Sequence, residues 1–182
     1  MKMVTRRHLA LVGILMTTTP TQAEDNTMRL EPEWEYVADT VMGGVSTGEV
    51  RDVLIAGRDA VQLTGDVSLE NNGGFIQMAF DLAHGSTLDA SGWAGIEMEV
   101  FGNGESYELR LRTDQLTRPW QSFRSAFEAG PEWQTIRIPW GEFEAHKTDA
   151  AFDPARLRRM GILAIGSKMR AGIALSSIQF YR

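Results

Sequence analysis

The chain has 182 residues, 43% of them hydrophobic and 23% charged, with a formal net charge of −6 and no cysteine. The length predicts one domain, the apolar content argues against disorder, and the acidic balance argues against nucleic-acid binding, which needs clustered Lys and Arg. The absence of cysteine excludes disulfides, thiolate catalysis and Cys-ligated metal centres.

Residues 1–23 have the pattern of a signal peptide, with an amphipathic N-terminal helix as the alternative. Three basic residues precede an apolar stretch at 9–16, which is too short to span a bilayer. Small residues, Thr21 and Ala23, then occupy the −3 and −1 positions. We therefore expect cleavage after Ala23 and a periplasmic or secreted protein, exported by the general or the twin-arginine route. The mature chain, 24–182, has 159 residues, a net charge of −9 and no segment that predicts a membrane span.

The mature chain has the period-two alternation of apolar and polar residues that is typical of half-buried strands. The clearest alternation lies at 61–69, 96–100 and 107–111. Further strands are expected at 34–37, 47–55, 75–82, 120–127, 133–139, 161–165 and 173–181. One helix is expected at 153–160, with Asp153 as N-cap and Pro154 at the first helical position. About ten short strands with turn signals between them predict an all-β, jelly-roll β-sandwich with one short helix.

The segments 96–100 and 107–111 are expected to pair as a hairpin across the loop 102–105. In that register Met98 faces Leu109 on the inner side, and Glu97 faces Arg110 on the outer side. A slip of one residue would bury charged side chains, so the alternation fixes which side chains face inward.

Catalytic motifs are missing from the sequence, so we expect no enzyme, no cofactor and no metal site. His84 and His146 lie far apart, and Ser46 or Ser68 lacks the Gly-x-Ser-x-Gly elbow of a nucleophile. Nothing selects a glycosidase pair among the 24 carboxylates. The acidic turn at 149–153 lacks the ligand spacing of a known calcium loop.

Two glycine-rich segments, 39–46 and 68–75, interrupt the strand pattern. The first reading of Asn72-Gly73 is a tight hairpin turn. The alternative is a pocket in which backbone amides and the side chains of Asp39, Asn71 and Asn72 meet a partner. Val41-Met42 is expected to be buried core, with an adaptable apolar contact as the alternative.

These segments carry a resemblance to a known family. The sequence resembles the complex I intermediate-associated protein 30 family at Val41-Met42-Gly43-Gly44-Val45-Ser46, Ser68-Leu69-Glu70-Asn71-Asn72-Gly73-Gly74-Phe75, Gly102-Asn103-Gly104-Glu105-Ser106-Tyr107, Leu109-Arg110-Leu111-Arg112-Thr113, Trp133-Gln134-Thr135-Ile136-Arg137-Ile138-Pro139-Trp140, Phe143 and Ile178-Gln179-Phe180-Tyr181. The resemblance implies a galactose-binding-like β-sandwich over 24–182. It also implies the role of an assembly chaperone for respiratory NADH:ubiquinone oxidoreductase, without enzymatic activity or cofactor.

The strand parity also predicts a surface patch. If the strands at 107–111 and 120–127 share a sheet, Arg110, Arg112, Trp120 and Arg124 form an aromatic and cationic face, which is typical of binding hot spots. The alternative for these residues is a solvated outer face. We therefore expect an exported, non-catalytic binding or assembly module that contacts a protein partner. A carbohydrate-binding module of the same sandwich class is the alternative, and a hydrolase is third.

Overall fold

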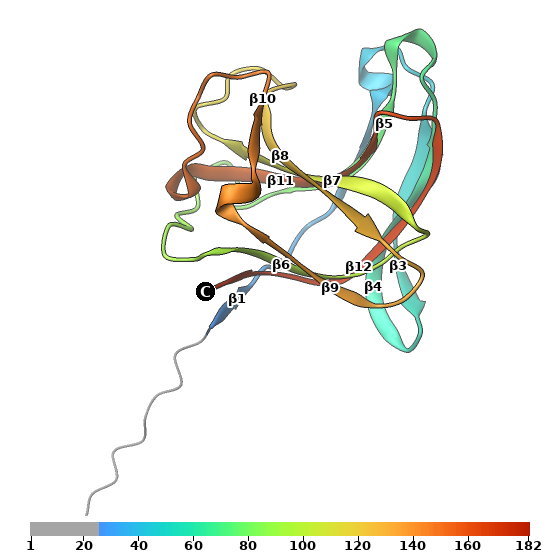
Figure 1. Ribbon diagram of the computed structural model, residues 1–182. Coiled ribbons are helices and arrows are strands. Elements are labelled where there is room, and N and C mark those ends of the chain that lie inside the picture. Colours follow the sequence, from blue (N-terminus) through green and yellow to red (C-terminus); the bar gives the residue numbers. More distant parts are fainter. Residues whose placement is uncertain (1–25) are drawn as a thin grey trace, which may run out of the picture.

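Residues 26–182 form two antiparallel six-stranded sheets, which pack face to face through the apolar side chains that alternate along their strands (Figure 1). This computed structural model describes residues 26–182, and the expected signal peptide lies outside the described residues. In sheet A the order is β3 (Thr47–Ile55), β4 (Arg58–Val67), β12 (Met169–Tyr181), β6 (Gly95–Phe101) and β9 (Gln134–Pro139), with β1 (Thr27–Arg29) on β12. In sheet B it is β10 (Glu144–His146), β8 (Ser122–Ala129), β7 (Glu105–Thr113), β11 (Leu157–Ile165), β5 (Phe75–Asp81) and β2 (Glu35–Ala38). The expected all-β sandwich is confirmed.

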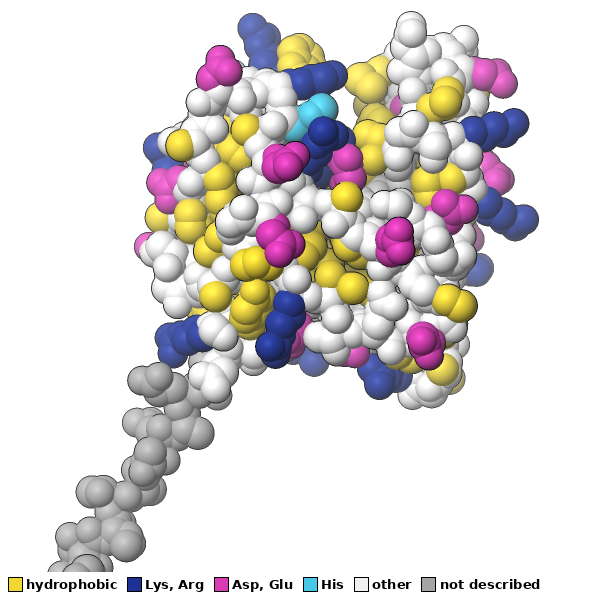
Figure 2. Space-filling model, in the orientation of Figure 1, with side chains coloured by type: hydrophobic (Ala, Val, Ile, Leu, Met, Phe, Trp, Pro, Cys, Tyr) yellow, Lys and Arg dark blue, Asp and Glu magenta, His cyan; other side chains and the backbone are white. Residues whose placement is uncertain are grey.

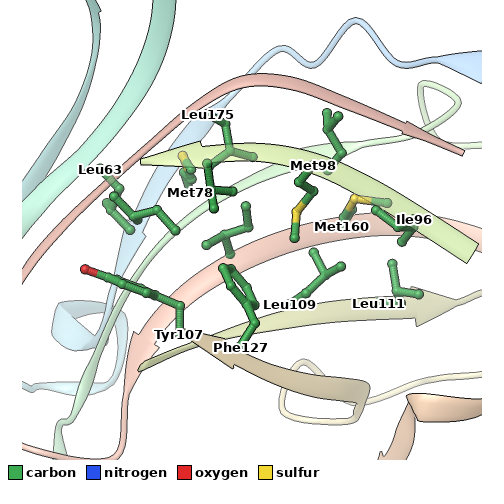
Figure 3. Packing of buried hydrophobic residues seen from close by; sticks show 14 of the residues in the cluster. Leu63, Met78, Ile96, Met98, Tyr107, Leu109, Leu111, Phe127, Met160 and Leu175 are labelled. Atoms are coloured by element: carbon green, nitrogen blue, oxygen red, sulfur yellow. The ribbon is translucent and has the colours of Figure 1, made fainter. Parts of the chain in front are cut away.

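Charged side chains lie on the outside of the sandwich (Figure 2), and apolar side chains fill the space between the sheets (Figure 3). Leu63 and Met98 of sheet A lie against Tyr107, Leu109 and Phe127 of sheet B in this core. The predicted alternation is confirmed in the segments 96–100 and 107–111, because their inner residues are at most 1% exposed; these are Ile96, Met98, Val100, Tyr107, Leu109 and Leu111. In the segment 61–69 it holds only as far as Val67, where β4 ends, and Leu69 beyond it is 53% exposed.

The expected hairpin between the segments 96–100 and 107–111 is wrong. The chain crosses at 102–105 from β6 in sheet A to β7 in sheet B, so the inner side chains of the two strands meet across the core. Glu97 pairs with Arg137 of β9 and accepts a hydrogen bond from Gln179 of β12, not from Arg110. Alternation specifies which face of a strand is buried, but it does not specify which strand lies beside it in the sheet. The pairing of these two segments could therefore not be predicted from their alternation.

Polar contacts fasten this crossing. The Asn103 amide donates to the carbonyl oxygen of Arg170 at 2.7 Å, and the Tyr107 hydroxyl donates to Asn103 Oδ1 at 2.7 Å. The same hydroxyl accepts from the N–H of Gly172 on β12 at 2.9 Å, so it joins the two sheets. Burial raises the pKa of Tyr107 to about 12, which keeps the phenol protonated over the physiological range.

The expected helix at 153–160 is wrong in extent. Within residues 26–182 the helical segments are four 3₁₀ turns: η1 (Asp39–Met42), η2 (Glu70–Asn72), η3 (Trp140–Glu142) and η4 (Pro154–Arg156). The Asp153 carboxylate caps η4 by accepting from the N–H of Ala155 at 3.0 Å. Leu157 already pairs with Thr113 and is fully buried, so the chain is extended from that residue onward. None of the described helical segments has the length and hydropathy to cross a membrane.

Candidate functional site

The carboxylate of Asp39 holds the two glycine-rich segments together. It lies at the end of β2, is fully buried, and accepts hydrogen bonds from the N–H groups of Ser46 (3.0 Å), Gly74 (2.6 Å) and Phe75 (3.3 Å). The Ser46 hydroxyl donates to it at 2.5 Å. We call these contacts the Asp39 clamp. The carboxylate therefore faces the interior of the protein, and Asp39 has no exposed surface.

Ser46 extends the clamp to a fourth strand end. Its hydroxyl oxygen accepts from the N–H of Ser68 at 2.9 Å, just after β4. The clamp thus fastens the ends of β2 and β5 in sheet B to those of β3 and β4 in sheet A. Ser46 is 1% exposed, so its hydroxyl cannot reach a substrate as a nucleophile would need to.

The clamp explains why glycine occurs in both segments. A Cβ at Gly44 would lie 2.3 Å from Asp39 Cγ, and one at Gly73 would lie 2.5 Å from Asp39 Oδ2. Each glycine therefore leaves the space that the carboxylate occupies. Burial alone would raise the pKa of Asp39, but the hydrogen bonds from Ser46, Gly74 and Phe75 outweigh burial and hold the pKa below its ordinary value.

The clamped segments present apolar side chains to solvent. Val41 is 72% exposed, Met42 62%, Leu69 53% and Val45 42%. We call these four residues the apolar tip. The expectation that Val41 and Met42 are buried core is wrong, because η1 is a surface turn at the end of the sandwich. Figure 2 shows hydrophobic side chains that reach the surface at this end.

Asn71 and Asn72 flank the apolar tip. Both are exposed and both have a left-handed backbone, with φ of 56° and 57°. The expected hairpin turn at Asn72-Gly73 is wrong, because the segment carries the chain from β4 in sheet A to β5 in sheet B. The left-handed pair supplies the sharp change of direction that this crossing needs.

The outer face of sheet B brings together three of the four residues of the predicted patch. Arg110 on β7 lies opposite Arg124 on β8, and both side chains contact Glu108, at 2.7 Å and 3.2 Å. Phe123 and Phe127 point inward. Arg110 and Arg124 thus share a carboxylate, Glu108, that the predicted patch did not include.

Arg112 of β7 contacts the loop that precedes Trp120, and Trp120 itself lies outside the sheet. Trp120 precedes β8 and is 52% exposed. The Arg112 guanidinium donates to the carbonyl oxygens of Leu116, Arg118 and Pro119 at 3.0–3.4 Å, and so ties this loop to β7. The expected strand at 120–127 therefore begins two residues late, and Trp120 lies in the loop before β8, between Pro119 and Gln121, which line the sheet B face.

The sheet B face is hollowed. Figure 2 shows the depression between the part that carries β10 and the part that carries the clamped loops, with Lys, Arg and His side chains at one side. His146 of β10 pairs with Ser122 of β8 at this face. Burial lowers the pKa of His146, and the nearby charges of Arg110 and Arg124 lower it further, so the imidazole is neutral at physiological pH.

Another cavity lies between the β3–β4 hairpin and the segment that follows β1. It measures about 550 Å³ and is lined by Trp34, Leu54 and three carboxylates, Glu31, Asp52 and Asp59. Among residues 26–182, no group of three or more His, Asp or Glu side chains could hold a metal ion. Its carboxylates therefore form an acidic rim and no metal site.

Sequence reasoning missed several contributors to these surfaces. Ser46 was considered as a nucleophile and not as a clamp residue. Its position two residues after the Gly-Gly pair, in a segment that resembles the family, is the signal that could have indicated its role. Glu108 and Arg159 lie together at the sheet B face because of the order of the strands in sheet B, and no local sequence pattern reveals that order. Ser122 of β8, which is 3% exposed, was not among the predicted site residues.

A family model described as "Complex I intermediate-associated protein 30" matches residues 22–175 of the chain. The match covers both clamped segments and most of the sandwich. Among curated proteins, none matches the chain significantly.

Solved structures match over most of the chain, at identities that show the fold alone. The family 11 carbohydrate-binding module from Clostridium thermocellum, in complex with a β-1,3-1,4-mixed-linked tetrasaccharide, is 12% identical with a TM-score of 0.69, over 85% of this chain and 95% of that one. The family 30 carbohydrate-binding module of a cellulosomal cellulase from the same organism is 15% identical with a TM-score of 0.59, over 85% and 96%.

Proposed function

The chain belongs to the complex I intermediate-associated protein 30 family, and from this membership we propose that it is an exported, non-catalytic binding or assembly module whose apolar tip contacts a protein partner. The family name describes association with an intermediate of complex I, which is a protein assembly. The signal-peptide pattern supports action in the periplasm or outside the cell.

The apolar tip is the observation that carries this proposal. Single exposed apolar residues are common on protein surfaces, but here four lie on two segments that one buried carboxylate fastens together. Because the clamp fixes the backbone in advance, little conformational entropy is lost when a partner covers these side chains. Met42 adds an unbranched side chain that adapts to the partner's shape.

Replacing Val41 and Met42 together by serine should abolish capture of the partner. Affinity purification from the cell envelope, compared by quantitative mass spectrometry, measures this. We expect at least a tenfold loss of the partner, since burial of two such side chains contributes about 3 kcal/mol or more. The melting temperature should hardly change, because both side chains are exposed.

Leu54→Ser is the matched control. Leu54 is 70% exposed on the far β3–β4 hairpin, so its replacement likewise lowers surface hydropathy without touching the apolar tip. A partner that Leu54→Ser retains and the double variant loses supports the proposal. Equal recovery by wild type, control and double variant would rule out the apolar tip as the contact.

A carbohydrate-binding module is the second candidate function. The fold shared with modules of families 11 and 30 favours it, as does the hollowed sheet B face, since the half-exposed Trp120 lies in the chain between Pro119 and Gln121, which line that face. Aromatic rings of this kind stack on sugar rings.

Trp120→Ala should weaken retention of the protein in polysaccharide-containing gels about tenfold, because it removes the stacking surface. Leu54→Ser is again the control and should migrate like wild type. If wild type migrates freely in every polysaccharide, the carbohydrate-binding function is wrong. That result would leave the proposed protein contact at the apolar tip unaffected.

A further inference from the structure

A small cavity opens on the outer face of sheet B, where β5, β7, β8 and β11 lie side by side. It has a volume of about 90 Å³, which suits a single ligand group and not a whole sugar chain. Gly161 and Ala79 are neighbours across β11 and β5 and form a flat floor without long side chains. Arg110, Arg112 and Arg159 stand around it.

These three arginines are incompletely neutralised. Arg110 shares Glu108 with Arg124, and Arg159 pairs with Glu35 at 2.7 Å. Among the ion pairs of residues 26–182, none includes Arg112, whose guanidinium donates to backbone carbonyls. The wall of this cavity is therefore positive on a chain of net charge −6.

Ser122 gives a second, independent sign of a ligand. It lines the cavity from β8 and is 3% exposed. Within the described part of the chain its Oγ has no hydrogen-bond partner. A buried hydroxyl without a partner destabilises the fold, and a ligand oxygen at this position would satisfy it.

The remaining polar groups suit a sugar. Gln77 and Gln121 line the same cavity. The Gln121 carbonyl oxygen accepts from the N–H groups of Thr117 and Arg118 at 3.1 Å and 3.0 Å, so its NH₂ group remains to donate to a ligand. Amide groups bind hydroxyls as well as carboxylates, and the indole of Trp120, next to Gln121 in the chain, offers a stacking face.

We propose that this cavity binds the carboxylate of an acidic saccharide, a uronate unit, with Arg110, Arg112 and Arg159 around the carboxylate and Ser122 donating to it. Planar guanidinium groups match the two oxygens of a carboxylate. This inference rests on the second candidate function and names the sugar class that the sheet B face would select.

Isothermal titration calorimetry with trigalacturonate tests the proposal on the full mature chain. We expect binding that weakens with added NaCl, and about a tenfold weaker affinity for Ser122→Ala and for Arg159→Gln. Ser122→Ala should also keep or raise the melting temperature, because the variant lacks the unpaired hydroxyl. Ser125→Ala, on the same strand but outside this cavity, should bind like wild type.

Four other ligand results would overturn the assignment. A neutral mixed-linkage glucan oligosaccharide that binds more tightly than trigalacturonate, and equally to Arg159→Gln, would overturn the acidic class while the carbohydrate function stands. Binding of neither sugar would overturn both. Inorganic phosphate that binds as tightly as trigalacturonate would show a general anion site, and polyglutamate that does so would assign an acidic protein instead. Unchanged affinity in Ser122→Ala would remove Ser122 from the site.

Discussion

Asp39→Ala should lower the free energy of unfolding by about 3–5 kcal/mol. The substitution leaves three backbone N–H groups and the Ser46 hydroxyl without the acceptor that they share in a buried place. It also releases four strand ends, from both sheets. Urea denaturation followed by tryptophan fluorescence measures the loss. Asp66→Ala is the control, because Asp66 is exposed on β4 and should change stability by about 0.5 kcal/mol or less.

The same carboxylate predicts an acid dependence. Its folded pKa lies below the ordinary value, so its stabilisation is present above the unfolded pKa, near 4, and is lost as the pH falls through the folded pKa. The difference in stability between wild type and Asp39→Asn should therefore shrink below about pH 4. A difference that stays constant from pH 7 to pH 3 would show that the charge of Asp39 contributes nothing.

Gly73→Ala should lower the free energy of unfolding by about 2–4 kcal/mol. Gly73 has an ordinary φ of −73°, so alanine meets no backbone strain there. Its Cβ would instead lie 2.5 Å from Asp39 Oδ2, an oxygen that Ser46, Gly74 and Phe75 hold in place. Denaturation with urea, as for Asp39→Ala, measures the effect.

Gly92→Ala is the matched control for Gly73→Ala, because a Cβ at Gly92 meets no atom within 4 Å. The clash also predicts non-additivity. In the Asp39→Ala background the two carboxylate atoms are gone and the Glu70 carbonyl oxygen, at 3.0 Å, remains, so Gly73→Ala should cost clearly less than in wild type. Additive losses in the double variant would mean that Gly73 is required for a reason other than the carboxylate.

Much of the fold could be predicted because alternation reports burial directly. The strand at 47–55 was predicted with the bounds it has in the structure, and the inner residues of β6 and β7 were all assigned to the correct face. Strand order could not be predicted. Glu97 meets Arg137, 40 residues away, because β6 and β9 are neighbours, and no local feature of either segment specifies that contact.

The candidate site, like the fold, could be predicted only in part. The glycine-rich segments and the family resemblance pointed to the correct region, and Asp39 was singled out from its position beside the first Gly-Gly pair. Its role could not be predicted, because a buried carboxylate and an exposed one look alike in a sequence; only Ser46 and Gly74, 7 and 35 residues away, decide which it is. The exposure of Val41 and Met42 follows from the clamp and was missed with it.

The strand order has a consequence for when the protein can fold. β12, which is the last strand along the described chain, lies in the middle of sheet A and pairs with β4, β6 and β1. Sheet A therefore cannot close before residues 169–181 have been synthesised, and β4 and β6 have unpaired edges until then. Folding of sheet A is therefore governed by the arrival of residues 169–181 more than by the stability of any earlier part.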